Sequence, residues 1–500
     1  MFENNHLLTW MTFWPLIGAV VILCTPSKAK LFIKQLAFLF TLPSLACGLW
    51  MLKDYDPALS YQFVAKVPWI ETFNIFYYIG VDGLSVPLLL LTVFLCPICI
   101  LASWGINDRI KGYFSLFLLL ETGMLGVFIA LDFFLFYVFW ELMLLPMYFL
   151  IGVWGGPRRE YAAIKFFLYT LFGSVFLFIA MIVLYVNTGS SFDLTTFGPD
   201  IAASSFWANA ASLKWWLFLA MFVAFAIKIP AFPFHTWLPD AHVEAPTAIS
   251  VILAGILLKM GTYGLLRISY PILPDMAVKF AIFIAIIAFI NIIYGALVAM
   301  AQTDLKKLVA YSSISHMGIV MLGMASMTHV GMNGAVLQMF NHGTITAMLF
   351  LLVGVVYDRA HHRNIDGFGG LAKNLPAYSG ITAVAFFAAL GLPSLSGFIS
   401  EFLVFLGGFM SHILWIRIIT IISTSGIVLT AVYMLWTYQR MFLGPLNEKY
   451  KDMPDCTLRE KCTLIPLAII VFIVGIFPSL VINWFEPTMG RLVELLSKNF

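Results

Sequence analysis

The sequence predicts an all-α integral membrane protein with about 14 transmembrane helices. Of its 500 residues 61% are hydrophobic and only 11% are charged, and the mean hydropathy is +0.95. Soluble domains are roughly half apolar and a quarter charged. Apolar runs of about 20 residues, the length that crosses a bilayer, follow one another along the whole chain. Lipid must therefore cover most of the predicted helical surface.

The spans are expected in chain order between short breaks that contain Pro, Gly or charged residues. They cover residues 5–25, 31–52, 84–105, 113–131, 133–154, 162–187, 214–238, 247–268, 276–300, 306–327, 330–357, 377–409, 413–443 and 463–484. The longest connections, 53–83, 188–213, 358–376 and 444–462, are too short for a folded extramembrane domain.

The distribution of Lys and Arg predicts the orientation. Most of the 28 Lys and Arg residues fall in the loops after odd-numbered spans. Because positively charged loops stay in the cytoplasm, both termini are expected outside. The net charge of +3 gives no reason to expect a nucleic-acid partner. Cys96 and Cys99 form a CxxC within an apolar run, where small core residues are a better interpretation than ligands of an iron–sulfur cluster.

Two spans are interrupted. The seventh contains Pro230, Pro233 and Pro239, and the twelfth contains the stretch GLPSLSG from Gly391. Broken helices at matching places in two halves are typical of transporters built from inverted repeats. The expected organisation is helices 1–3 in 1–112, a first five-helix repeat in 113–270, a second, inverted repeat in 271–445, and a loop, helix 14 and a short tail in 446–500.

Several ionisable residues lie inside the predicted spans: Glu121, Glu141, Lys228, Lys259 and Glu401. Each costs at least about 2.5–3.5 kcal/mol to insert at mid-membrane, so a functional role is the default interpretation. A static ion-pair role is the alternative for the glutamates, and for Glu121 the two are evenly balanced.

The residue types indicate proton transfer. A carboxylate at Glu141 stabilises an ammonium at Lys228, and moving the two apart favours proton release, which makes a switchable site. His316 and His342 each share a helix face with small polar residues and titrate near neutral pH, which suits a relay. A core histidine with satisfied hydrogen bonds is almost as good an interpretation of both. His235 follows the break in the seventh span and is a possible relay residue or part of a funnel.

Four long motifs carry a family resemblance: WELMLLPMYFLIGVWGG, KIPAFPFHTWLPDAHVEAPTAISVILAGILLKMGTYG, LKKLVAYSSISHMG and LPSLSGFISEF. With them the chain resembles the antiporter-like proton-pumping subunits of respiratory complex I, NADH:quinone oxidoreductase, over nearly its whole length. Matching motifs place that family's functional residues on Glu141, Lys228, Lys259 and Glu401. Glutamate at the last position is typical of the chain M type, the mitochondrial subunit-four type, whereas chains L and N have lysine there.

The resemblance implies a subunit of a proton-translocating enzyme in the inner (plasma) membrane of a bacterium, with chains L and N types as neighbours in the lipid bilayer. It also implies no cofactor in this chain, with FMN, iron–sulfur clusters and a quinone in other subunits. Two alternatives stay open. The chain is a subunit of a multi-component sodium/proton antiporter, or it is a structural spacer whose charges only hold neighbours together.

Overall fold

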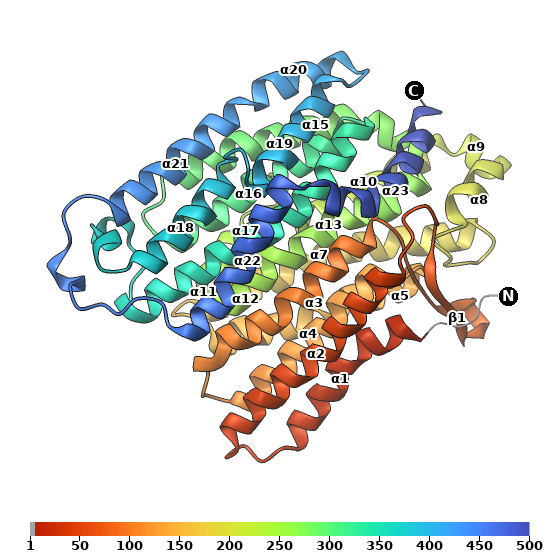
Figure 1. Ribbon diagram of the computed structural model, residues 1–500. Coiled ribbons are helices and arrows are strands. Elements are labelled where there is room, and N and C mark those ends of the chain that lie inside the picture. The colour runs from red at the N-terminus through yellow and green to blue at the C-terminus, as the bar shows by residue number, and fades with distance from the viewer. Residues whose placement is uncertain (1–5, 500) are drawn as a thin grey trace.

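The structure is a computed structural model that describes residues 6–499. It is a bundle of helices that lie side by side along one common direction (Figure 1). The first half consists of α1 (Leu7–Cys24), α2 (Lys30–Asp54), α3 (Ser85–Ala102), α4 (Ile110–Ile129), α5 (Phe133–Leu142), α6 (Leu144–Trp154), α7 (Arg159–Asn187), α8 (Phe197–Ala203), α9 (Ser205–Asn209), α10 (Ala211–Lys228), α11 (Trp237–Glu244), α12 (Thr247–Ile252), α13 (Leu258–Gly264) and α14 (Tyr270–Ile272).

The second half consists of α15 (Pro274–Met300), α16 (Leu305–Ala325), α17 (His329–Ala360), α18 (Pro376–Ala389), α19 (Ser396–Phe409), α20 (Leu414–Ser423), α21 (Ser425–Phe442), α22 (Leu458–Ile476) and α23 (Ser479–Ser497). Within the described residues, 12 helices are long and apolar enough to cross a membrane, and a bent pair of helices raises this to 13. The remaining predicted span consists of the short apolar helices α18 and α19. The all-helical membrane fold is thus confirmed.

Burial differs strongly between the spans. The most apolar stretches of the eighth span, Thr247–Ile272, and of α17 are fully buried, whereas only 28% of the corresponding stretch of α2 and 33% of that of α20–α21 is buried. The exposed side chains of these outer helices are large and apolar, for example Trp50, Leu414 and Val428. The core of the protein is therefore the centre of the bundle, and its outer helices present an apolar surface that suits lipid.

Both predicted breaks are present. The chain leaves helical geometry between Lys228 and Trp237 and again between Ala389 and Ser396. Polar side chains of neighbouring helices bind backbone groups at both breaks. Asn291 of α15 donates to the Pro230 carbonyl at 3.1 Å, and Asn341 of α17 donates to the Ser396 carbonyl at 2.7 Å. Such partners are required because lipid offers none.

Three features differ from the sequence-based expectation. The connection 53–83 contains an antiparallel hairpin of β1 (Gln62–Ile70) and β2 (Ile75–Val81). The connection 188–213 contains α8 and α9. The last expected span, 463–484, is two helices, α22 and α23, which meet at 67°. Pro478 lies at this bend, where its missing N–H cannot continue the helix ladder of α22.

The two ends of the bundle differ in composition. The hairpin, α8, α9 and α23 lie together at one end, on the right in Figure 1. The loops that carry most of the basic residues, including the loop before α22, lie at the other end. The start of α1 and the end of α23 both lie at the hairpin end, as expected for a chain whose two termini are on the same side.

Candidate functional site

Lys259 lies at the centre of the eighth span and is completely buried. It follows a π-helical turn, Leu253–Leu257, that widens the helix just before it. Such a turn shifts the backbone hydrogen bonds and exposes a carbonyl. The Lys259 ammonium donates to the Ala254 carbonyl, five residues earlier, and lies 2.6 Å from Nδ1 of His342 on α17. The local helix geometry therefore positions this ammonium for contact with the second half of the chain.

A line of ionisable side chains extends from Lys259 through His342 and His316 to Glu401. The ring centroids of His342 and His316 are 5.7 Å apart, which is too far for a direct hydrogen bond. A cavity of about 10 Å³ lies between His316, His342, Gln338 and Glu401, which is room for about one water molecule. Nε2 of His316 is 3.5 Å from Oε1 of Glu401. The four ionisable groups thus form one nearly continuous line through the protein interior.

The hydrogen bonds of His316 define its charge. Nδ1 lies 2.7 Å from the Ser312 carbonyl, and Nε2 lies 2.9 Å from the Ala389 carbonyl. Because a carbonyl can only accept, the two hydrogen bonds form together only when both ring nitrogens carry hydrogen, that is, when the ring is an imidazolium. The Ala389 carbonyl is free to accept because α18 ends there, at the break in the twelfth span.

His342 has the opposite character. Its Nδ1 faces the Lys259 ammonium, which can only donate, so Nδ1 is an acceptor and the ring is neutral. Its Nε2 is buried and has no partner among the protein atoms described. A neutral histidine between an ammonium and an imidazolium can accept a proton on one side and release one on the other.

The predicted ion pair of Glu141 and Lys228 is not formed. Within the part of the chain described, the two groups interact electrostatically but do not come within 4.0 Å. The Lys228 ammonium has no hydrogen-bond partner there and lies 4.7 Å from the centre of the Trp140 ring. Oε1 of Glu141 is also without a partner. Because α10 ends at Lys228, this ammonium lies at the break itself.

Glu121 and His235 lie apart from this line. Glu121 is completely buried on α4 and interacts with the thiols of Cys96 and Cys99. His235 lies in the first break, stacked on Phe232 with 5.7 Å between ring centroids. No contact connects either of them with Lys259 among the interactions described.

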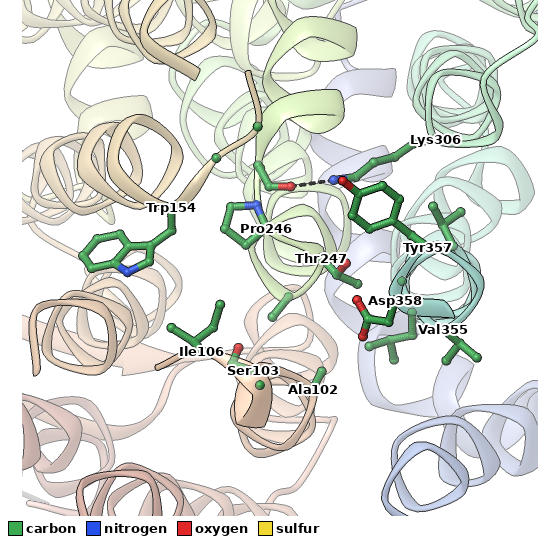
Figure 2. Close-up of a pocket in the computed structure, with 18 of the residues that line it drawn as sticks. Ala102, Ser103, Ile106, Trp154, Pro246, Thr247, Lys306, Val355, Tyr357 and Asp358 are labelled. Carbon is green, nitrogen blue, oxygen red and sulfur yellow. Dashed lines mark hydrogen bonds between the residues drawn. The ribbon is translucent and has the colours of Figure 1, made fainter. Parts of the chain in front are cut away.

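Sequence reasoning missed a cavity of about 500 Å³ at the end of the bundle where the basic loops lie. Figure 2 shows Lys306 and Trp154 on opposite sides of it, with Pro246 and Thr247 between them. Lys306 is the first residue of the predicted span 306–327 and was not among the candidate site residues, yet it is only 4% exposed and its ammonium donates to the Ala245 carbonyl at 2.5 Å. Its position in the first turn of a predicted span, after the N-cap Asp304, was the available signal.

His242 interacts with one lysine of this cavity and with one lysine of the buried line. The His242 ring is completely buried, stacks on Phe350 and has no hydrogen-bond partner on either nitrogen among the atoms described. It interacts electrostatically with both Lys306 and Lys259. A titratable ring with two unpaired nitrogens between two lysines is suited to water-mediated proton transfer.

The groups on this line share one chemical property. Its members are ammonium, imidazole and carboxylate groups, all of which exchange protons. Among the described residues no group of three or more His, Cys, Asp or Glu side chains is placed to hold a metal ion. The geometry thus offers a chain of proton donors and acceptors across the middle of a membrane.

Comparisons with known proteins agree with this chemistry. Residues 130–430 match the transmembrane family of NADH:quinone oxidoreductase and the Mrp antiporter, and residues 55–131 match the amino terminus of NADH-ubiquinone oxidoreductase chain 4. NADH-quinone oxidoreductase subunit M of Rhodobacter capsulatus is 43% identical over 98% of this chain and 97% of its own length. NADH-ubiquinone oxidoreductase chain 4 of Chondrus crispus is 40% identical over 99% of this chain and 98% of its own.

Solved structures share the fold. A chain of respiratory complex I from Thermus thermophilus superposes with a TM-score of 0.88 at 28% identity and covers 98% of this chain and 99% of its own. A chain of the Mrp complex from Dietzia superposes with a TM-score of 0.84 at 19% identity over 100% of this chain and 99% of its own, which shows a common fold. The chain therefore belongs to the subunit M (chain 4) family of complex I, the proton-pumping, antiporter-like membrane subunits of NADH:quinone oxidoreductase.

Proposed function

We propose that protons cross this subunit along Lys259, His342, His316 and Glu401. The observation that carries the proposal is the close spacing along the line: 2.6 Å from Lys259 to His342, one water-sized cavity between the histidines, and 3.5 Å from His316 to Glu401. The charges fit a relay, because an ammonium and an imidazolium flank a neutral histidine. One proton transfer from Lys259 to His342 moves the positive charge toward Glu401.

Glu141 and Lys228 are proposed as the switch that controls this line. The Lys228 ammonium lies at the end of a broken helix with no hydrogen-bond partner described, so its main stabilisation is the electrostatic field of Glu141 and the face of Trp140. A movement of Glu141 away from Lys228 favours release of the lysine's proton toward the centre. A movement toward Lys228 favours its reloading.

The cavity beside Lys306 is proposed as the cytoplasmic entrance. The positive-inside rule places the basic loops, and this cavity with them, in the cytoplasm. Protons reach the Lys259 region past His242 and leave on the outer side after Glu401. The two breaks then belong to the two inverted repeats, 113–270 and 271–445, with entry through the first and exit through the second.

Energy must come from outside this chain. Moving one charge against 100 mV costs about 2.3 kcal/mol. As a subunit of complex I, the chain receives this energy from electron transfer in other subunits, where FMN, iron–sulfur clusters and quinone are expected. Subunits of the chain L and chain N types are the proposed neighbours, with Glu141 and Glu401 toward opposite ones. A bacterial plasma membrane is the proposed location.

The test is proton pumping by the assembled complex in inverted membrane vesicles, measured by quenching of a pH-sensitive dye on addition of NADH. Glu141→Gln and Lys259→Ala are each expected to abolish most of the quench while the complex still assembles. Lys34→Ala is the matched control, because Lys34 is also a buried lysine of a span but donates to the Trp104 carbonyl at the periphery. Full pumping by Lys259→Ala would contradict the proposed route.

A further inference from the structure

A second buried charge cluster lies outside the proposed route. Arg267, near the end of the eighth span, and Asp82, just after β2, are 7% and 4% exposed. The guanidinium binds the carboxylate with two nitrogens, with 2.8 Å between Nη1 and Oδ2, and it also donates to Tyr263, Tyr61 and Ser85. Each nitrogen of Arg267 thus has a partner, which makes this a fully satisfied buried ion pair.

The cluster lies on the continuation of the Lys259 helix face. Lys259, Tyr263 and Arg267 are spaced by four residues, so their side chains follow one another along one side of the helix. The rise per residue puts Arg267 about 12 Å from Lys259 along the axis. This direction leads away from the cytoplasmic cavity and toward the hairpin end of the bundle, which is the outer side in the proposed orientation.

The hydrogen bonds of this cluster cannot relay a proton. Arginine does not lose its proton in proteins. The Tyr263 hydroxyl accepts from Nε of Arg267 at 3.1 Å and lies 3.2 Å from the Ser85 hydroxyl. It donates its own hydrogen to the Phe128 carbonyl at 3.0 Å, so the Ser85 hydroxyl is the donor in their contact. A backbone carbonyl has no proton to pass on, so the chain of hydrogen bonds ends there.

The C-terminal helix covers the cluster. The Gly83 amide, next to Asp82, donates to the Thr488 hydroxyl of α23 at 3.2 Å. A Cβ on Gly83 would lie only 2.6 Å from the Phe485 Cα and from the Trp484 carbonyl oxygen. Backbone therefore packs directly on backbone beside Asp82, which leaves no room for water between Gly83 and α23.

We propose that Asp82, Arg267 and Tyr263, covered by α23, form a proton seal between Lys259 and the outside. The inference rests on the proposed route through Lys259. Lys259 lies in a span of the first repeat. Without a seal at the outer end of this span, a proton at Lys259 could leave directly to the outside along the same span. With this end dry and closed to proton transfer, the contact with His342 is the remaining way forward, and the proton passes sideways into the second repeat.

The test is passive proton leak in vesicles that contain the purified complex, measured without NADH as the decay of an imposed pH difference. Arg267→Met leaves the Asp82 carboxylate buried and unpaired, which draws in water, so we expect a leak several-fold faster than in the parent complex. The double variant Asp82→Leu with Arg267→Met replaces the pair by a dry apolar contact. We expect it to be as tight as the parent and to pump.

A control is Arg359→Met, which breaks a largely buried pair with Glu460, 2.8 Å long, beside the cavity that contains Lys306. It should weaken the protein without a leak. If Arg267→Met fails to assemble, Tyr263→Phe replaces it, since it removes only the hydroxyl that closes the hydrogen-bond chain. If the Arg267→Met or Tyr263→Phe complex leaks protons no faster than the parent complex, the seal is overturned. A double variant that does not leak but no longer pumps also overturns it, because the pair would then carry protons.

The seal and the route can fail separately. In the leaky variant, addition of Lys259→Ala is expected to slow the leak, because the proton then lacks its carrier at the centre. A leak that persists with Lys259→Ala supports the seal and contradicts the route through Lys259.

Discussion

Gly391 tests how closely the second break is fitted to Glu401. This glycine has φ of +77°, in the left-handed region that side chains disfavour. A Cβ added to it would lie 3.1 Å from Oε2 of Glu401, closer than an ordinary contact. Gly391→Ala therefore strains the same segment that presents the Ala389 carbonyl to His316 and that faces the carboxylate.

The size of the effect follows from these two contacts. Left-handed geometry costs a residue with a Cβ about 1–2 kcal/mol. The carboxylate must in addition move by a few tenths of an ångström. If the break relaxes to relieve 1–2 kcal/mol, the geometry with both acceptors on His316 becomes roughly 5–30 times less populated. If proton transfer between His316 and Glu401 limits the rate, the rate of proton pumping is expected to fall by up to the same factor.

The assay compares NADH-driven dye quenching in vesicles with Gly391→Ala and with Gly444→Ala. Gly444 has nearly the same backbone strain, with φ of +81°, but nothing lies within 4 Å of its added Cβ. Gly444→Ala should therefore pump like the parent complex. Equal pumping by the two variants would refute the reasoning, because strain at the break would then have no connection with Glu401.

Two further predictions concern the cytoplasmic side. Lys306→Met keeps the volume of the side chain but removes the ammonium from the Ala245 carbonyl, so dye quenching should fall strongly. Lys307 is the half-exposed neighbour, and the Lys307→Met complex should pump normally. Equal loss in both variants would argue against an entrance at Lys306. Asp455 should dock the loop before α22: burial would raise its pKa, but backbone amides of Cys456, Ala377 and Tyr378 donate to the carboxylate and hold the pKa below the usual 3.8. This stabilisation is present above pH 3.8 and is lost as the pH falls through the lowered pKa. Asp455→Asn should therefore speed proteolysis of this loop at pH 7 by an amount equivalent to about 0.5–2 kcal/mol, the value of a helix cap. Proteolysis at the rate of the parent protein would contradict this prediction.

Much of the fold was predictable because the bilayer constrains the sequence so strongly. All 14 predicted spans are helical, and both broken spans lie where Pro or Gly interrupts an apolar run. Lys259 and Glu401 stood out because a charge in an apolar run is costly and therefore rare. The family resemblance was confirmed by the close relatives, whereas the roles of the individual site residues stay predictions.

The contacts between distant segments were not predictable. Periodicity places His342 on a polar face of its helix, but only the packing of α17 against the π-helical turn brings it to Lys259. Arg267 and Lys306 were not singled out because both lie at the ends of their predicted spans, and charge position alone does not report burial. The hairpin was missed because its two strands show little alternation of polar and apolar residues.

The helix irregularities explain how this line can hold cations and still release them. The π-helical turn offers Lys259 the Ala254 carbonyl, and the second break offers His316 the Ala389 carbonyl. Separating a charge from a counter-ion 4 Å away costs about 4 kcal/mol at an effective dielectric constant near 20, whereas a hydrogen bond from a charged group contributes about 1.5–3 kcal/mol. Cations held by carbonyls therefore pass a proton on more easily than cations held in tight ion pairs. The irregular backbone at both places is therefore part of the proposed transfer chemistry. Glu401, the only carboxylate on the line, lies at the end of the line, where the proton has to pause before it leaves.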